Sequence, residues 1–222
     1  MAHPYYPPTL SLPHYAPPSH AVSTLLLGMA LLSAAALALA WHVMTRLNPT
    51  LSRRAKAAAA WFLFSGLLHV HFEGYYVKHR ATLAARRDFA ADLWKEYAKS
   101  DSRYLARDSF VVAIEGLTVI FLGPLCLLTF LAIVLGSRKQ HPARLLACCC
   151  HLYGCALYFV TATLDGNRHC RPEPLYFWGY YVACNLPWIV VPALLGWRSV
   201  KAIEREFEGR GRRIARGSKR KA

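Results

Sequence analysis

Five runs of apolar residues, each long enough to cross a lipid bilayer, constrain this chain more than any other feature. A helix needs about 20 predominantly apolar residues to cross the hydrocarbon core. In lipid every backbone group must be bonded within the protein, which restricts single segments of this kind to helices. The sequence therefore predicts an all-α integral membrane protein in which a bundle of five transmembrane helices occupies residues 21–197. The predicted spans are residues 21–47, 57–77, 109–136, 145–164 and 175–197.

Segments of different composition flank and connect these spans. Residues 1–20 hold six prolines and three tyrosines, which predicts an extended segment near the membrane surface. The loop between the second and third spans carries apolar side chains at roughly helical spacing, with charges between them. This pattern favours a short amphipathic helix on the membrane surface, over residues 87–99, although an ordinary solvated linker helix fits it equally well. Residues 198–222 form a basic tail.

The formal net charge of +15 raises the question of a nucleic-acid partner. The basic residues lie between the spans and in the tail, however, where they act as topology signals. The loops 46–56 and 137–144 and the tail carry 17 Lys and Arg, whereas the loops 78–108 and 165–174 carry 10. This excess predicts a cytoplasmic carboxyl terminus, and membrane lipid rather than nucleic acid as a partner. The last four residues, KRKA, resemble a basic retrieval signal of the endoplasmic reticulum.

The cysteines and histidines predict neither a disulfide framework nor a resident metal. The seven cysteines are odd in number, and six of them lie inside predicted spans. His69 and His71 form a His-x-His pair, but residues two apart do not face each other on a helix. A metal site there is the weaker interpretation, and we expect no metal and no cofactor.

Two acids, Glu73 and Glu115, are each the only charged side chain in their apolar run. A charged side chain at the centre of a membrane helix costs roughly 2.5–3.5 kcal/mol on insertion scales. Such residues usually face the bundle interior or a cavity and serve a function there. A structural polar contact between helices is the plainer alternative for one acid. It is less favoured for two acids that both have polar partners at helical spacing.

The partners of the two acids lie on the same helix faces. His69 precedes Glu73 by four residues, and Thr118 follows Glu115 by three, so each pair can meet on one side of its helix. An imidazole beside a carboxyl group can orient it and share its proton.

The two acids also lie at similar depths in the predicted bundle. Glu73 is five residues before Lys78, and Glu115 is seven residues after Asp108, at about 1.5 Å of rise per residue. The fifth span contributes an Asn and a Trp, three residues apart, near its middle. We expect one intramembrane ligand cavity lined by His69, Glu73, Glu115, Thr118, Asn185 and Trp188.

Such a cavity suits general acid–base chemistry on an apolar substrate. A protonated carboxyl group can donate a proton to an alkene, and a second group can remove a proton from a neighbouring carbon, which moves the double bond. Carboxylates and an indole face would stabilise the intermediate carbocation. Cationic amphiphilic amines should inhibit because they mimic that cation.

Several stretches of the chain resemble the emopamil-binding protein family, the 3β-hydroxysteroid Δ8,Δ7-isomerases of sterol biosynthesis, and its plant branch in particular. They are AHPYYPPTLSLPHY, HVHFEGYYV, WKEYAKSDSRY, DSFVVAIEGLT, LYGCALYF and LYFWGYYVACNLPW. Together they run from the amino terminus to residue 188. The resemblance implies a five-helix protein of the endoplasmic reticulum membrane that moves a sterol double bond from C8–C9 to C7–C8 without a cofactor.

The resemblance also implies roles for individual residues. A proton is delivered at C9, a cation forms at C8 and a proton leaves C7, with the donor at C9 left open. Thr118 and Asn185 would orient groups or bond water, and Trp188 would face the cation. The candidate catalytic residues are His69, Glu73 and Glu115, and the candidate substrate-binding residues are Thr118, Asn185, Trp188, Tyr104 and Tyr158.

Two other functions fit parts of the pattern. One is a non-catalytic binding protein for sterols or cationic amphiphiles, resembling the sigma-two receptor of the same superfamily. The other is a proton-coupled transporter, although five helices without an internal repeat argue against it. A homodimer is left open by the sequence.

Overall fold

The computed structural model describes residues 3–219 of the chain, with side chains as far as residue 209. Within this range the regular elements are helices, apart from one isolated antiparallel bridge between Asp101 and Cys170. The prediction of an all-α protein is confirmed for the described residues. The KRKA motif at the extreme carboxyl terminus lies at and beyond their limit.

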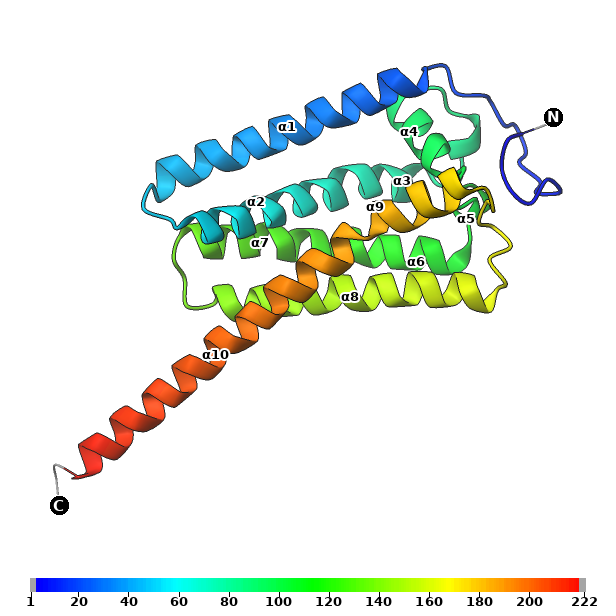
Figure 1. The fold of residues 1–222 in the computed structure, drawn as a ribbon. Helices are drawn as coiled ribbons and strands as arrows, with labels where there is room; N and C mark the ends of the chain where they lie inside the picture. The colour runs from blue at the N-terminus through cyan, green and yellow to red at the C-terminus, as the bar shows by residue number, and fades with distance from the viewer. Residues whose placement is uncertain (1–2, 220–222) are drawn as a thin grey trace.

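Long helical segments alternate with short connections along the chain (Figure 1). Several of them are continuous helices that change their hydrogen-bonding pattern part-way. The long segments are α1 (Val22–Leu47); α2 (Arg53–Leu67) with η1 (Leu68–Glu73) and α3 (Gly74–His79); α6 (Ser109–Leu117) with η3 (Thr118–Leu122) and α7 (Gly123–Val134); α8 (Gln140–Leu164); and η4 (Leu175–Val182) with α9 (Ala183–Asn185) and α10 (Pro187–Lys219). The short helices are η2 (Leu83–Ala85), α4 (Phe89–Tyr97) and α5 (Arg103–Ala106).

Four of the described helices are long and apolar enough to cross a membrane, which indicates a multi-pass membrane protein. They are Val22–Leu47, Ser109–Val134, Gln140–Leu164 and Leu175–Gly209. The second long segment, residues 53–79, has the length of a span, but His69, His71 and Glu73 lower the hydropathy of its apolar part. A fifth crossing therefore stays a prediction.

Several helix ends differ from the predicted limits for identifiable reasons. The second long helix begins at Arg53 rather than at residue 57, because the Ser52 side chain caps it by accepting a hydrogen bond from the Ala55 backbone N–H. The last helix does not end at residue 197 but continues through the predicted tail to Lys219. Ion pairs one turn apart, such as Lys201 with Glu204 at 2.9 Å, suit a helix there.

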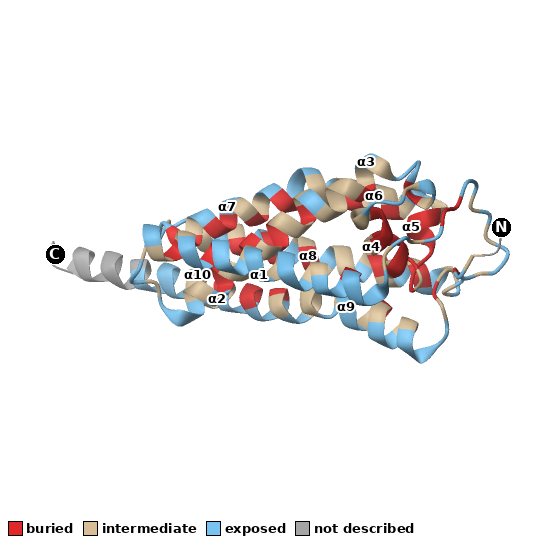
Figure 2. Cartoon of the chain, turned by 90° about the horizontal axis from the view of Figure 1, so that it is seen from above, coloured by how far each residue is buried: buried red, intermediate tan, exposed pale blue. Residues whose placement is uncertain are grey.

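The helices form a bundle with α1 on its outside. Helix α2 packs against α1 and α7, and α8 packs against α7 and α10. Buried residues concentrate around α4 and α5 and along the inner side of α7, whereas α1 is largely exposed (Figure 2). The inner helices therefore enclose the polar residues, and α1 presents most of its surface to its surroundings.

Three of the long segments contain π-helical turns, in which the backbone bonds reach one residue further than in an α-helix. Such turns are frequent at functional sites. The segment η1 holds both His69 and Glu73. Gly123, which opens α7, faces η1 so closely that an added Cβ would lie 2.8 Å from a Val70 methyl carbon and 3.3 Å from the Cβ of His69. A glycine here allows α7 to approach the polar turn of the second segment.

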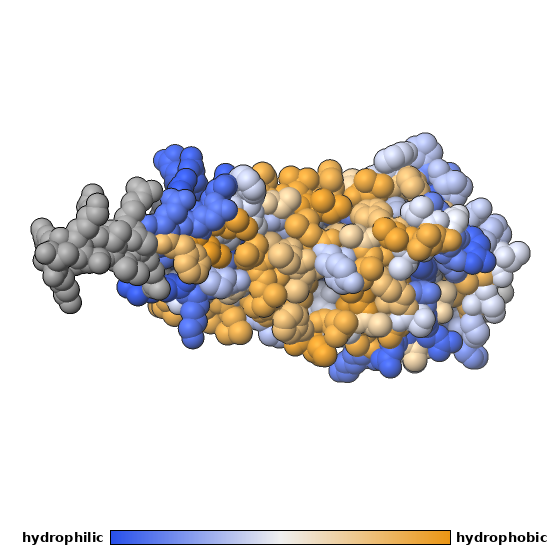
Figure 3. Space-filling view, turned by 90° about the horizontal axis from the view of Figure 1, so that it is seen from below, coloured by the Kyte–Doolittle hydropathy of each residue, from blue (hydrophilic) through white to orange (hydrophobic). Residues whose placement is uncertain are grey.

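The connections gather at two ends of the bundle. The loop end comprises residues 3–20, 80–108 and 165–174, and the tail end comprises residues 48–52, 135–139 and the end of α10 (Figure 1). Hydrophilic surface lies at both ends, with an apolar belt between them (Figure 3). The two loops that the count of basic residues grouped with the tail therefore lie at the tail end, and the other two loops lie together at the loop end. Which end faces the cytoplasm stays a prediction.

Buried charged residues of α4 bind the amino-terminal segment, residues 3–20. Asp92 of α4 accepts hydrogen bonds from the Ser19 backbone N–H at 2.8 Å and from the His20 ring at 2.8 Å. The fully buried Lys95 donates to the Ala16 carbonyl at 2.8 Å and also to the Arg86 carbonyl. These contacts hold α4 against the amino-terminal segment.

Candidate active site

The first predicted pair is formed as the spacing requires. The Nδ1 atom of His69 lies 2.7 Å from Oε1 of Glu73, one turn further along η1. His69 is buried, and the second carboxyl oxygen of Glu73 is buried without a hydrogen-bond partner. The pair therefore presents one unengaged carboxyl oxygen inside the bundle.

The second ring nitrogen of His69 meets a residue that the sequence analysis missed. Its Nε2 atom lies 2.9 Å from Nε2 of His151, which is buried in the middle of α8. One ring must donate and the other accept, so the two histidines hold complementary tautomers. A signal was present, because His151 is the only histidine in the apolar run 145–164.

Glu115 is held from the loop end of the bundle. Tyr104 of α5 donates its phenolic hydrogen to Oε1 of Glu115 at 2.6 Å, and both side chains are buried. The carboxyl group of Glu73 lies close enough for its charge to act on that of Glu115. The structure thus brings the two predicted acids together, and each is supported by a different aromatic or imidazole partner.

Aromatic rings surround Tyr104 and connect it to Asn185. The rings of Tyr104 and Tyr97 lie 5.4 Å apart, and the Tyr97 hydroxyl accepts a hydrogen bond from the Asn185 amide at 3.1 Å. Asn185 also donates to the Tyr181 carbonyl at 2.7 Å. Asn185 is therefore connected to Glu115 through Tyr97 and Tyr104, and its amide donates hydrogen bonds to Tyr97 and Tyr181.

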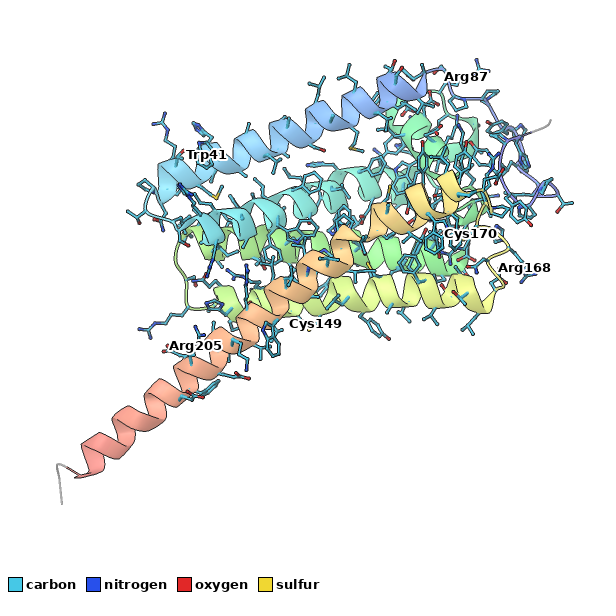
Figure 4. All side chains as sticks on the ribbon, viewed as in Figure 1. Trp41, Arg87, Cys149, Arg168, Cys170 and Arg205 are labelled. Carbon is cyan, nitrogen blue, oxygen red and sulfur yellow. The ribbon has the colours of Figure 1, made fainter. Side chains whose placement is uncertain are left out.

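Tyr158 belongs to a neighbouring buried ion pair rather than to the acids themselves. Its hydroxyl donates to Asp101 at 2.5 Å, and Asp101 also binds Arg103, whose Nη2 atom lies 2.7 Å away. Cys170, whose backbone forms the isolated antiparallel bridge with that of Asp101, is labelled at the loop end in Figure 4. Burial disfavours the charge of Arg103, but the hydrogen bonds and the charge of Asp101 outweigh this effect and raise the pKa of Arg103. The pair therefore stays charged next to Tyr158.

The remaining two predicted residues form other contacts: Thr118 lies one turn after Glu115, and Trp188 packs on the rings of α2. The Thr118 hydroxyl donates to the Ile114 carbonyl of its own helix at 2.9 Å. Trp188 packs against Trp61, with ring centroids 5.5 Å apart, and its indole N–H is buried without a hydrogen-bond partner. Trp61 in turn lies 6.5 Å from the His151 ring, so Trp188 is connected to His69 through two rings.

Comparison with known proteins adds an independent observation. Residues 89–199 match a protein family described as EXPERA, the expanded EBP superfamily. The chain is 37% identical over 207 residues to a probable 3-beta-hydroxysteroid-Delta(8),Delta(7)-isomerase of Arabidopsis thaliana, covering 91% of this chain and 90% of the relative. It is 36% identical over 208 residues to a rice protein of the same description, covering 93% and 94%. A guinea-pig 3-beta-hydroxysteroid-Delta(8),Delta(7)-isomerase is 32% identical over 205 residues, covering 90% and 88%.

The chain belongs to the EXPERA family. The EXPERA match contains Tyr104, Glu115 and His151, whereas His69 and Glu73 precede it. The alignments with the curated relatives extend over about nine-tenths of the chain. The site therefore combines residues from the EXPERA region with a pair contributed by the helix before it.

Two of the hollows on the described part of this EXPERA protein lie away from the two acids. One, of about 690 Å³, lies at the loop end between the amino-terminal segment and the residues after α8, among them Tyr6, Asn167 and Phe177. The other, of about 320 Å³, lies between α1 and α2. Its lining includes Trp61 and Phe64, and both of these rings pack on Trp188. A closed cavity around the acids stays a prediction.

Proposed function

We propose that this protein is a sterol Δ8,Δ7-isomerase that shifts the C8=C9 double bond to C7=C8. The observation that supports this most is the proximity of Glu73 and Glu115 inside an apolar bundle, with His69 and Tyr104 bonded to one acid each. Two neighbouring buried carboxyl groups hold a proton between them more easily than two negative charges. The pair can therefore supply one proton and accept another.

The reaction needs no net change in atoms or charge. A proton from the acid pair adds at C9, the positive charge forms at C8, and the proton at C7 is lost to a basic group of the same site. The negative charge left on the carboxyl pair stabilises the cation, and so does the indole face of Trp188. Asn185 and Thr118 orient the sterol or a bound water, and Tyr158 with Tyr104 shapes the loop end of the site.

The wider setting follows from the same proposal. The second long segment, residues 53–79, forms a fifth crossing, and its polar turn is tolerated in the membrane because it faces the bundle interior. The sterol occupies an intramembrane cavity bounded by this turn, by α6 and by the last long segment, which comprises η4, α9 and α10. The protein lies in the endoplasmic reticulum membrane with its tail in the cytoplasm. Cationic amphiphilic amines inhibit it, and a homodimer is compatible with the exposed α1 surface.

Rescue of a sterol-isomerase-deficient yeast tests the activity directly. The wild-type chain should convert the accumulated Δ8-sterol to its Δ7 isomer, and membranes assayed in deuterium oxide should place deuterium at C9. Sterol binding without conversion would instead support the non-catalytic binding protein. Absence of deuterium at C9 in a Δ7 product would contradict protonation there.

Replacement of Glu115 tests the acid pair. Glu115→Gln keeps the shape and one acceptor for Tyr104 but removes the exchangeable carboxyl proton. Because general acid–base groups contribute typically 10²–10⁴-fold, turnover should fall at least about hundredfold, measured as the Δ7/Δ8 sterol ratio at equal expression. Glu173→Gln, at an exposed residue outside the helices, is the matched control and should leave the ratio unchanged.

A further inference from the structure

Three potential metal ligands converge beside the acid pair. They are Nε2 of His69 in η1, Nε2 of His151 in α8 and Sγ of Cys126 in α7, and all three atoms lie within 4.8 Å of one another. Each of these residues is buried, and Cys126 is completely so. Two imidazoles and a thiolate are ligands that zinc prefers.

The separations are close to those of a tetrahedral zinc site. Zinc–nitrogen bonds of about 2.0–2.1 Å and zinc–sulfur bonds of about 2.3 Å place ligand atoms roughly 3.3–3.6 Å apart. The two histidine nitrogens lie 2.9 Å apart, and the sulfur lies within 4.8 Å of both. Metal binding therefore needs rotation of the rings and an approach of the Cys126 side chain, and the three helices already hold the ligands around one point.

The groups behind the ligands also suit a bound cation. A metal-binding histidine usually gives its other ring nitrogen to a carboxylate, which orients the ring and raises its basicity. His69 has this arrangement, since its Nδ1 atom is 2.7 Å from Glu73. A zinc ion with one thiolate carries a net charge of +1, which an ionised Glu73 neutralises. This balance matters because an unpaired charge inside the membrane region is costly.

We propose that His69, His151 and Cys126 form a zinc-binding site through which Zn²⁺ inhibits the isomerase. On binding, the Cys126 thiol loses its proton to solvent, and the histidine that donates through Nε2 moves its Nε2 proton to its own Nδ1. The sulfur and both Nε2 lone pairs then bind the metal, leaving the fourth position for water. His69 and Glu73 are then held in the metal site and no longer exchange protons with the sterol. The inhibitory role rests on the proposed isomerase function, whereas the binding site does not. It requires no resident metal for catalysis.

Cobalt(II) provides a readout that is independent of activity. Titration of the purified full-length protein in detergent should give the visible bands of tetrahedral cobalt and a near-ultraviolet thiolate-to-cobalt charge-transfer band, both removed by added Zn²⁺. Cys126→Ala should abolish the charge-transfer band, and His151→Gln should weaken both features. The matched controls are Cys149→Ala, at an exposed neighbour on α8, and His71→Gln, at an exposed residue of η1. Both controls should keep the wild-type spectrum.

The activity assay tests the inhibitory role. Zn²⁺ should inhibit the wild-type protein, and Cys126→Ala should retain turnover while its half-inhibitory Zn²⁺ concentration rises at least about tenfold, since even changes behind the ligands typically cost 10–100-fold in affinity. Cys126→Ser serves the same purpose if the alanine variant does not fold. A wild-type spectrum without the charge-transfer band, or one that Cys126→Ala leaves unchanged, overturns the site. Equal zinc sensitivity of wild type and Cys126→Ala overturns its role. A cobalt spectrum without any isomerase activity would instead refute the proposed function alone.

Discussion

Tyr104 connects the interfacial part of the chain with the buried acids. It lies in the short helix α5, and its hydroxyl reaches down to Glu115 at 2.6 Å. Burial and the neighbouring negative charge of Glu115 raise the pKa of Tyr104 well above its usual value. The phenol therefore stays protonated at neutral pH and acts as a fixed donor to the carboxyl group.

Removal of this donor should slow the reaction without unfolding the protein. A hydrogen bond to a charged group contributes about 1.5–3 kcal/mol, so Tyr104→Phe should lower turnover roughly 10–100-fold in the sterol-profile assay. Tyr76→Phe is a close control, because the Tyr76 ring lies 5.1 Å from that of Tyr104 and its buried hydroxyl has no partner. If both variants lose activity equally, the bond to Glu115 is not the cause.

At this scale the sequence predicted contacts within a helix better than contacts between helices. The four-residue spacing of His69 and Glu73 dictated their contact, and similar depth predicted that the two acids would approach each other. The partner of His69 across the bundle, His151, could not be deduced from spacing, because it depends on how α8 is rotated about its axis. Tyr104 entered the candidate set, but its bond to Glu115 depends on a loop conformation that no periodicity encodes.

Among the elements, the predicted apolar runs correspond to helices whose ends and internal turns differ in detail. Caps such as Ser52 move a helix start by several residues, and charged side chains one turn apart extend the last helix. The Gly123-Pro124 pair marks the change from η3 to α7. The π-helical turns themselves were not predicted, because they arise from packing against neighbouring helices and leave no simple pattern in the sequence.

The contact between α4 and the amino-terminal segment should depend on pH. Burial of Asp92 opposes its ionisation, but hydrogen bonds from His20 and Ser19 outweigh this effect and lower the pKa of its carboxyl group. A lowered folded-state pKa stabilises the fold above the unfolded value of about 3.9, and this contribution is lost as the pH falls below that value toward the folded pKa. The amino-terminal segment should therefore detach in acid.

Hydrogen exchange of residues 3–20 measures this detachment. Exchange in the wild-type protein, corrected for its intrinsic pH dependence, should increase below about pH 4. Asp92→Asn should show increased exchange already at neutral pH, whereas Asp165→Asn, at a residue outside this contact, should behave like the wild type. Unchanged protection in Asp92→Asn would mean that other contacts, such as those of Lys95, suffice to hold the segment.

On the scale of the whole molecule, hydropathy and charge account for most of the architecture. The apolar belt and the two hydrophilic ends follow from the runs and loops of the sequence (Figure 3). The long helix α10 extends beyond the bundle at the tail end (Figure 1). The second long segment is the exception, because the polar residues proposed for the site also lower its hydropathy below that of the four candidate spans.

The orientation of the molecule is open to a direct test. With 17 basic residues at the tail end and 10 at the loop end, the tail end should face the cytoplasm. Protease added to sealed microsomes should remove an epitope tag at the carboxyl terminus and leave a tag at the amino terminus intact until detergent is added. The reverse result would show that the basic loop 78–108 outweighs the tail.

Because α1 is largely exposed, its packing affects how a hydrophobic molecule reaches the interior of the bundle. The hollow between α1 and α2 is walled by Trp61 and Phe64, the same rings that flank Trp188. If the proposed function holds, a sterol dissolved in the surrounding lipid would reach Trp188 through this hollow without passing through water.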